Sequence, residues 1–327
     1  MNQRRVLRIG TGAVALAIFF RLAAAGMVQP LALIQNRELI SFLIFLETGR
    51  FPRTFVVENQ TVQSPEPEEE TMETTETAAS GGQETDLTLT AEDLSYVSVQ
   101  YACDYRPDLG TLMEEPLDWD LTGKAPTVLI LHSHATESYA GAEDYRSTAE
   151  SENMVAIGDE VARILEAGGI RVIHDRTFYD YPDYNQSYVL ARSAIRDWLA
   201  AYPSIQMVID IHRDAAETTS GQLVTSSTVG GQRSAQLMMV VGTAATGNYF
   251  PDWEENLSLA LKLSAVLEQE NPGICRPVTL REHRFNMDLS AGSMLIEVGA
   301  AGNTMEEARI AANALAQGIL AISEGVN

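Results

Sequence analysis

From about position 125 onward, the apolar residues of the chain follow two alternating spacings. Short aliphatic runs predict strands at residues 127–131, 171–173, 207–211, 237–241 and 294–298. Between them, apolar positions three and four residues apart predict helices at residues 154–167, 187–201, 253–269 and 304–322. This alternation predicts an α/β domain over residues 94–327, with a mainly parallel or mixed sheet flanked by helices.

The pattern near the amino terminus predicts a membrane anchor at residues 1–30. Arginines among the first eight residues precede an apolar stretch at residues 9–28, whose single charge is Arg21. A spanning helix needs roughly 20 apolar residues, and the basic flank predicts a cytoplasmic amino terminus. Small residues at 23–26 leave a cleaved signal peptide as the alternative. Either interpretation places the rest of the chain outside the cytoplasm.

Two segments follow the expected anchor. Residues 31–58 are partly apolar, but polar residues at 35–38 disfavour a second span and predict a helical segment on the membrane or against a partner. Residues 59–93 are rich in Glu, Thr, Ser and Pro. Such a segment buries too little apolar area to offset the entropy of ordering, so we expect a disordered acidic linker that acts as a tether.

Charge and cysteine content narrow the possible functions. The chain has 45 Asp and Glu residues against 22 Lys and Arg residues, which argues against a nucleic-acid partner because such partners need a basic surface. Cys103 and Cys275 are too few for a disulfide framework, and the sequence leaves open whether they pair. Any zinc site would therefore use histidine and carboxylate ligands.

Three predicted strands carry polar residues at or near their carboxyl ends, where open α/β sheets bind ligands. These residues are His132, His134, Glu137, His212, Arg213 and Glu297. Each of them alone would more often be structural than catalytic. Their convergence on three strand ends predicts one composite site.

The spacing of His134 and Glu137 predicts that a turn after the first strand brings an imidazole and a carboxylate to one metal ion. With His212 they form a His, Glu, His set that leaves the fourth position of a zinc ion open for water. Zinc lowers the pKa of such a water to about 7. His132 shares a face with His134 if the strand continues, so the choice between the two histidines stays open.

Glu297 and Arg213 are the candidate catalytic residues. Glu297 interrupts an apolar strand, where an unpaired charge is costly, and it is suited to move a proton without binding the metal. Arg213 could clamp a substrate carboxylate, or it could balance Asp210 or Asp214.

The residues at these strand ends resemble those of the stage II sporulation protein P family. The resemblance lies in residues 129–139, residues 209–215 and residues 295–299, of which the Asp-Ile-His-Arg-Asp-Ala run is specific. Residues 42–49 also resemble the membrane-proximal segment of that family. The likeness covers residues 125–327 well and the amino terminus loosely.

The resemblance implies a zinc-dependent N-acetylmuramoyl-L-alanine amidase of endospore-forming bacteria. Such an enzyme cuts the peptidoglycan bond between the glycan lactyl group and the stem peptide, and family members are also credited with cleaving cross-links. It would act in engulfment, with stage II sporulation proteins D and M as partners. The implied location is a single-pass cell-membrane protein whose catalytic domain lies between the mother-cell and forespore membranes.

The family's site residues can be carried over by position. A zinc histidine falls on His132 or His134, with His134 preferred; the second falls on His212, and the catalytic glutamate on Glu297. The sequence departs from many zinc amidases at Asn153, where those enzymes place the ligand glutamate, so Glu137 must supply the carboxylate. Near residues 285–288 a glutamine would be expected and is missing.

Two rival interpretations remain. One is another cell-wall peptide metallohydrolase that uses the same site, such as a carboxypeptidase or a deacetylase. The other is a non-enzymatic, membrane-anchored module that binds the wall.

Overall fold

The computed structural model describes residues 87–117, 119–219, 221–247 and 249–324. The expected anchor, the membrane-proximal segment and residues 59–86 of the expected linker lie outside the described residues. At the end of that expected linker, residues 91–93 belong to the short 3-10 helix η1 (Ala91–Tyr96). No helix in the described part of the chain is long and apolar enough to span a membrane.

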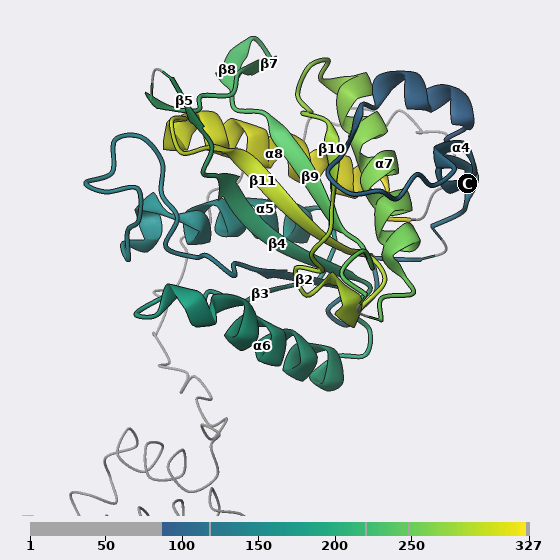
Figure 1. The fold of residues 1–327 in the computed structure, drawn as a ribbon, viewed down its shortest axis with the longest axis horizontal. Coiled ribbons are helices and arrows are strands. Elements are labelled where there is room, and N and C mark those ends of the chain that lie inside the picture. Colours follow the sequence, from purple (N-terminus) through teal and green to yellow (C-terminus); the bar gives the residue numbers. More distant parts are fainter. Residues whose placement is uncertain (1–86, 118, 220, 248, 325–327) are drawn as a thin grey trace, which may run out of the picture. The chain divides into compact units, whose positions relative to one another are not determined.

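A seven-stranded sheet forms the centre of the domain (Figure 1). Its strands in spatial order are β1 (Val99–Tyr101), β10 (Val278–Arg281), β9 (Leu237–Gly242), β11 (Ser293–Ala300), β4 (Met207–Asp214), β2 (Val128–Leu131) and β3 (Val172–His174). All neighbours pair parallel except β9 and β11, which pair antiparallel. The prediction of an α/β fold with a mainly parallel or mixed sheet is therefore confirmed.

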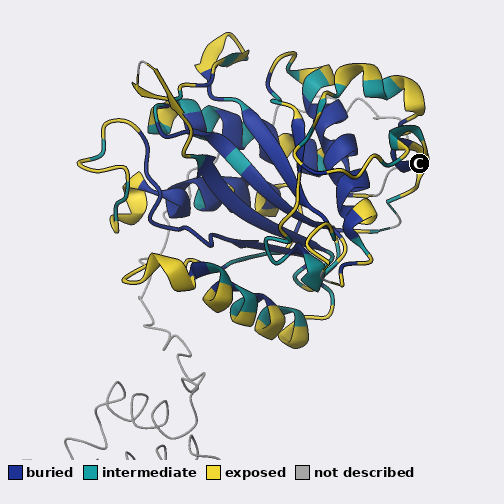
Figure 2. Cartoon of the chain, viewed as in Figure 1, coloured by how far each residue is buried: buried dark blue, intermediate teal, exposed yellow. Residues whose placement is uncertain are grey.

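Helices cover both faces of this sheet, which explains why its central strands β2, β4, β9 and β11 are almost entirely buried (Figure 2). On one face, α5 (Met154–Ala167), α7 (Trp253–Glu270) and α8 (Met305–Ala321) pack with the larger hydrophobic core. On the other face, α6 (Ser187–Ala201) packs Ala191 and Ile195 against the β2 residues Leu129 and Leu131. Alternate residues of β2 thus enter opposite cores, as the strand geometry requires.

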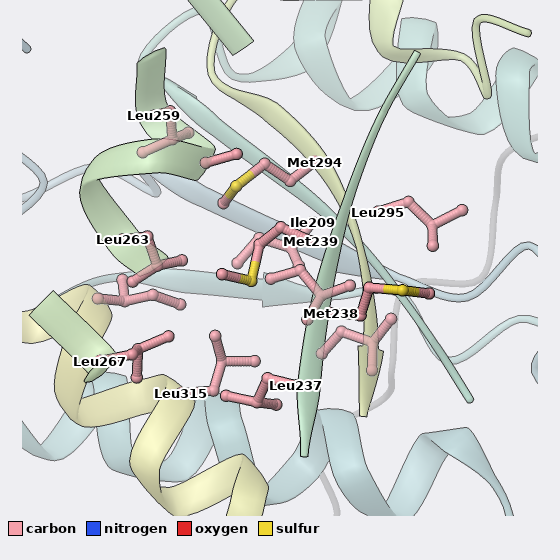
Figure 3. Close-up of a cluster of buried hydrophobic side chains, with 14 of the residues drawn as sticks. Ile209, Leu237, Met238, Met239, Leu259, Leu263, Leu267, Met294, Leu295 and Leu315 are labelled. Carbon is pink, nitrogen blue, oxygen red and sulfur yellow. The ribbon is translucent and has the colours of Figure 1, made fainter. Parts of the chain in front are cut away.

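The larger core shows how helical spacing meets the sheet. Leu259, Leu263 and Leu267 form a stripe on α7 and lie toward Met239 of β9 and Met294 of β11 (Figure 3). Their spacing of four residues places all three on one helix face. The packing of α7 on β9 and β11 holds β11 in place, and β11 in turn pairs with β4. These two strands carry Glu297 and His212.

Most long elements match the sequence prediction, and the departures have physical causes. Helices α5 and α6 have the predicted bounds, and α8 begins with the expected cap, in which Thr304 and Glu307 form a capping box. Strand β4 continues three residues further than predicted because it stays paired with β11 as far as Ala300.

Several short elements were not predicted. They are β1, β10, the short helix α4 (Leu109–Glu114), the hairpin of β5 (Glu217–Thr218) and β6 (Gly221–Gln222), and the hairpin of β7 (Ser227–Val229) and β8 (Gln232–Ser234). These strands have two to four residues and contain polar side chains in place of the continuous aliphatic run that marked the equally short β2.

Lys262 is completely buried in α7 and stabilises the end of α4. Its Nζ donates to the carbonyl oxygens of Leu112, at 3.0 Å, and Met113. These carbonyls belong to the last turn of α4, where no helical donor remains to pair them. We expect Lys262→Met to lower the free energy of unfolding by roughly 2–3 kcal/mol, because two buried acceptors lose a charged donor.

Urea unfolding of the full chain would measure this effect. The exposed Lys124 provides the matched control, and Lys124→Met should change the free energy by less than about 0.5 kcal/mol. Equal effects of the two substitutions would contradict the assigned role of Lys262.

Candidate metal centre

Among the described residues, His134, Glu137 and His212 bring three possible metal-ligand atoms within 4.8 Å of one another. All three side chains are buried. The Nδ1 atom of His134 lies 3.6 Å from Glu137 Oε1, and the Nδ1 atom of His212 lies 3.5 Å from Glu137 Oε2. The set predicted from the sequence is thus assembled at the carboxyl ends of β2 and β4.

The loop that follows β2 is held by hydrogen bonds and places Glu137 beside His134 and His212. The backbone N–H of Glu137 donates to the carbonyl oxygen of His134 at 3.1 Å, which closes a tight turn. On either side of this turn, Ser133 N–H donates to Asp210 at 2.7 Å, and Tyr139 Oη donates to the carbonyl oxygen of Val298 at 2.6 Å. The loop is therefore anchored to both β4 and β11.

Neighbouring side chains orient the two imidazoles. His134 Nε2 lies 3.0 Å from Ser187 Oγ, at the start of α6. His212 Nε2 lies 2.9 Å from Asp210 Oδ1, a close charged contact. These contacts occupy the Nε2 side of each ring and turn both Nδ1 atoms toward Glu137. Such outer partners commonly fix the ring orientation of metal-binding histidines.

The carboxylate of the donor set is ionised. Burial opposes ionisation of Glu137, but its contacts with His134 and His212 and the charge of Arg213 hold its pKa well below the usual range. The backbone N–H of Arg213 also donates to Glu137 Oε2 at 3.2 Å. Glu137 is therefore a carboxylate at neutral pH.

The three side chains are close enough to share one metal ion. Zinc–nitrogen and zinc–oxygen bonds of about 2.0–2.2 Å in a tetrahedron place neighbouring ligand atoms about 3.4 Å apart. His134 Nδ1 lies 3.6 Å from Glu137 Oε1 and His212 Nδ1 lies 3.5 Å from Glu137 Oε2, so each imidazole is near this distance from one of the two carboxylate oxygens. Two imidazole nitrogens and a carboxylate are also a ligand set that catalytic zinc uses.

His132 does not join this set, although it was a candidate ligand. Its Nδ1 lies 3.0 Å from the carbonyl oxygen of Ile211, and its Nε2 lies 2.8 Å from His174 Nε2. Burial lowers the pKa of His132 to about 3 and that of His174 to about 4, so both rings are neutral. A Cβ atom at Gly158 would lie 2.6 Å from His132 Nε2, so only glycine leaves room for the pair.

Glu297 lies beside the donor set on β11, where its backbone is paired in register with that of His212. Its Oε2 atom is buried without a hydrogen-bond partner in the described part of the structure. Burial raises the pKa of Glu297 to about 8. The carboxyl is thus a proton-carrying group outside the donor set, adjacent to it.

Arg213 has a different environment from that of a substrate clamp. Its Nε donates to the carbonyl oxygen of Ser138 at 2.9 Å, and its Nη2 donates to that of Tyr145 at 2.8 Å. Its Nη1 lies 3.9 Å from Glu137 Oε1. Asp214, a possible partner of Arg213, instead accepts from Arg276 at 2.8 Å.

Sequence reasoning missed the aromatic surroundings of His134. The ring of Tyr184 stacks on His134 with centroids 4.4 Å apart, and Tyr188 approaches it edge-on at 5.2 Å. Phe285 lies 6.0 Å from Tyr188, so the loop before β11 reaches this region. The sequence predicted only that a helix starts at residue 187. Nothing in that pattern indicated that Tyr184 would contact His134, which lies 50 residues earlier in the chain.

The remaining histidine and Asn153 lie outside the donor set. His283 is exposed and contacts Phe285 edge-on at 6.2 Å. Asn153 caps α5, because its side chain accepts from the Val155 N–H at 3.0 Å. The start of this helix therefore supplies no carboxylate to the centre.

The fold and the site together define an α/β protein with a candidate His, Glu, His metal centre and an adjacent, partly buried glutamate whose Oε2 atom is buried. Comparison with known families goes further: the model for stage II sporulation protein P matches residues 32–320. The chain belongs to the stage II sporulation protein P family, which confirms the family predicted from the sequence.

A curated relative and several solved structures resemble this chain. Stage II sporulation protein P of Bacillus subtilis (strain 168) is 31% identical over 211 residues, which cover 60% of this chain and 50% of the relative. The chain thus spans about half the length of that curated relative.

Among solved structures, the N-acetylmuramoyl-L-alanine amidase AmiC2 of Nostoc punctiforme is 17% identical, with a TM-score of 0.38, and the match covers 60% of this chain and 95% of the other. The CwlD amidase of Clostridioides difficile, in complex with the GerS lipoprotein, is 18% identical, with a TM-score of 0.37 and coverage of 59% and 96%.

Proposed function

We propose that the chain is a zinc-dependent peptidoglycan hydrolase that cleaves the N-acetylmuramoyl-L-alanine amide. The observation that carries this proposal is the buried set of His134, Glu137 and His212 beside Glu297, whose Oε2 has no partner among the described residues. Membership of the stage II sporulation protein P family supports the same substrate class.

Each residue of the centre has a role in this reaction. His134, Glu137 and His212 would hold the zinc ion, which supplies Lewis-acid polarisation and a water of lowered pKa. In its ionised form, which the charge of a bound zinc ion would favour at neutral pH, Glu297 accepts a proton from the attacking water and delivers it to the nitrogen of the leaving L-alanine. The lactyl carbonyl carbon gains the water oxygen, the amide C–N bond breaks, and the products are a lactyl carboxylate and a free amino terminus.

We propose further that this hydrolysis serves engulfment during sporulation. The resemblance at the membrane-proximal segment and the predicted anchor support a single-pass membrane protein whose catalytic domain acts on peptidoglycan between the mother-cell and forespore membranes. Stage II sporulation proteins D and M are the partners that this role implies. The acidic linker would give the domain reach between anchor and wall.

Product analysis of muropeptides treated with the purified full chain tests the proposed reaction. We expect an intact stem peptide with a free L-alanine amino terminus, a glycan with a free lactyl group, loss of both products with a chelator, and their return with zinc. Cleavage within cross-links would add an endopeptidase activity at the same centre. Release of D-alanine or acetate alone would favour the carboxypeptidase or deacetylase alternative, and binding without cleavage would favour the wall-binding module.

A further inference from the structure

A cavity of about 220 Å³ adjoins the candidate metal centre. Glu137 lines it and is also one of the three candidate ligands. Its other walls include two arginines, Arg146 and Arg213, and the aromatic ring of Tyr184. A substrate bound at the metal centre can therefore extend into a pocket that contains two guanidinium groups.

The two arginines differ in what they already bind. Arg213 donates to two backbone carbonyl oxygens and supports Glu137, as described above. Arg146 has its Cζ 3.8 Å above the centroid of the Tyr184 ring. Within the described ranges it makes no ion pair or side-chain hydrogen bond, and the cavity's acid Glu217 accepts from Gln222 at 3.0 Å. Stacking on a ring leaves the N–H groups at the edge of a guanidinium available for a bidentate carboxylate.

We infer that Arg146 binds a free carboxylate of the substrate's stem peptide, an inference that rests on the proposed function. Tyr184 connects Arg146 with the centre, because the same ring stacks on His134 at 4.4 Å. A carboxylate carried by the residue after L-alanine lies about 4–7 Å from the scissile amide, one to two residue lengths. The Tyr184 ring lies 4.4 Å from the His134 ring and 3.8 Å from Arg146 Cζ, so the guanidinium is within reach of a carboxylate one to two residues from the scissile amide.

The chemistry of the stem peptide narrows the ligand. Its second residue, when it is D-isoglutamate, is linked through its side chain and keeps a free α-carboxylate. Amidation to D-isoglutamine removes that charge while preserving the shape. The chain is acidic overall, so an anionic peptide is attracted only where a local cation outweighs the surrounding charge. Arg146 therefore makes the site selective for the isoglutamate form.

The test compares two soluble muropeptides that differ only in isoglutamate or isoglutamine. We expect the wild-type full chain to prefer the isoglutamate peptide by roughly 10–100-fold in kcat/KM, mainly through KM. In Arg146→Met, kcat/KM for the isoglutamate peptide should fall to a value similar to that for the isoglutamine peptide. The zinc content of this variant should stay that of the wild type. Arg146→Lys should restore part of the preference, because lysine keeps the charge but not the bidentate geometry.

Matched measurements separate this inference from others. Arg196→Met, at an exposed position on α6, should leave the preference unchanged. A preference that survives in Arg146→Met, or an equal loss for both peptides together with lost zinc, would overturn the inference. If the wild type cleaves neither peptide, the proposed function fails; equilibrium binding of the same pair to wild type and Arg146→Met then decides the role of Arg146.

Discussion

Replacing Glu297 with glutamine should reduce kcat by roughly 10²–10⁴-fold while the protein keeps its zinc. The side chain lies beside the donor set without belonging to it, and its Oε2 atom has no partner among the described residues. Glutamine keeps the shape of the side chain and the strand pairing with His212, but it cannot accept and return a proton. Loss of turnover with retained metal is thus the signature of a proton-transfer residue.

The stability of this variant distinguishes lost chemistry from lost folding. The pKa of Glu297 is raised to about 8 in the folded protein from a usual 4.5. Between these values the unfolded chain is ionised and the folded one largely protonated, so the carboxyl costs stability that grows as pH rises. A neutral glutamine lacks this cost. The melting temperature of the metal-free variant at pH 7 should therefore be no lower than that of the metal-free wild type.

Glu306 offers a matched control, because it is an exposed glutamate in the first turn of α8. Glu306→Gln should leave kcat and zinc content unchanged. If Glu297→Gln cleaves muropeptides as fast as the wild type, then Glu297 does not transfer the proton. That result would contradict the proposed catalytic role of Glu297.

The sequence was sufficient where local pattern and final structure depend on the same residues. The strands that carry His212 and Glu297 are apolar runs, which are buried whatever strand they pair with. The first turn after β2 follows from the spacing of His134 and Glu137. The ends of these elements could therefore be predicted to converge.

The sequence was insufficient where contacts join distant segments. Strand β2 ends at Leu131, so the rule that residues two apart share a face does not extend to His132 and His134. What turns His132 away is His174 together with the space left at Gly158, neither of which a strand pattern reveals. The antiparallel β9 likewise depends on its pairing with β11, because its own apolar run carries no direction.

The second large effect should come from Glu137. Glu137→Gln should lower zinc affinity by more than the roughly 10–100-fold that an outer partner costs, because it removes the only ligand charge of the proposed set. Activity at limiting zinc should fall on the order of 10³-fold or more, since the metal contributes several kcal/mol to the transition state. Titration with a zinc-sensitive dye and calorimetry would measure the affinity.

Asn153 provides the sharpest comparison, because it occupies the position where many zinc amidases were expected to place the ligand carboxylate. Its side chain instead caps α5 and donates to the carbonyl oxygen of Ser147 at 2.9 Å. Asn153→Ala should therefore cost about 1 kcal/mol of stability and leave zinc affinity almost unchanged. The opposite pattern, with zinc lost in Asn153→Ala and kept in Glu137→Gln, would mean that another carboxylate completes the centre. The paired result thus decides whether the turn after β2 or the start of α5 supplies what the metal centre needs.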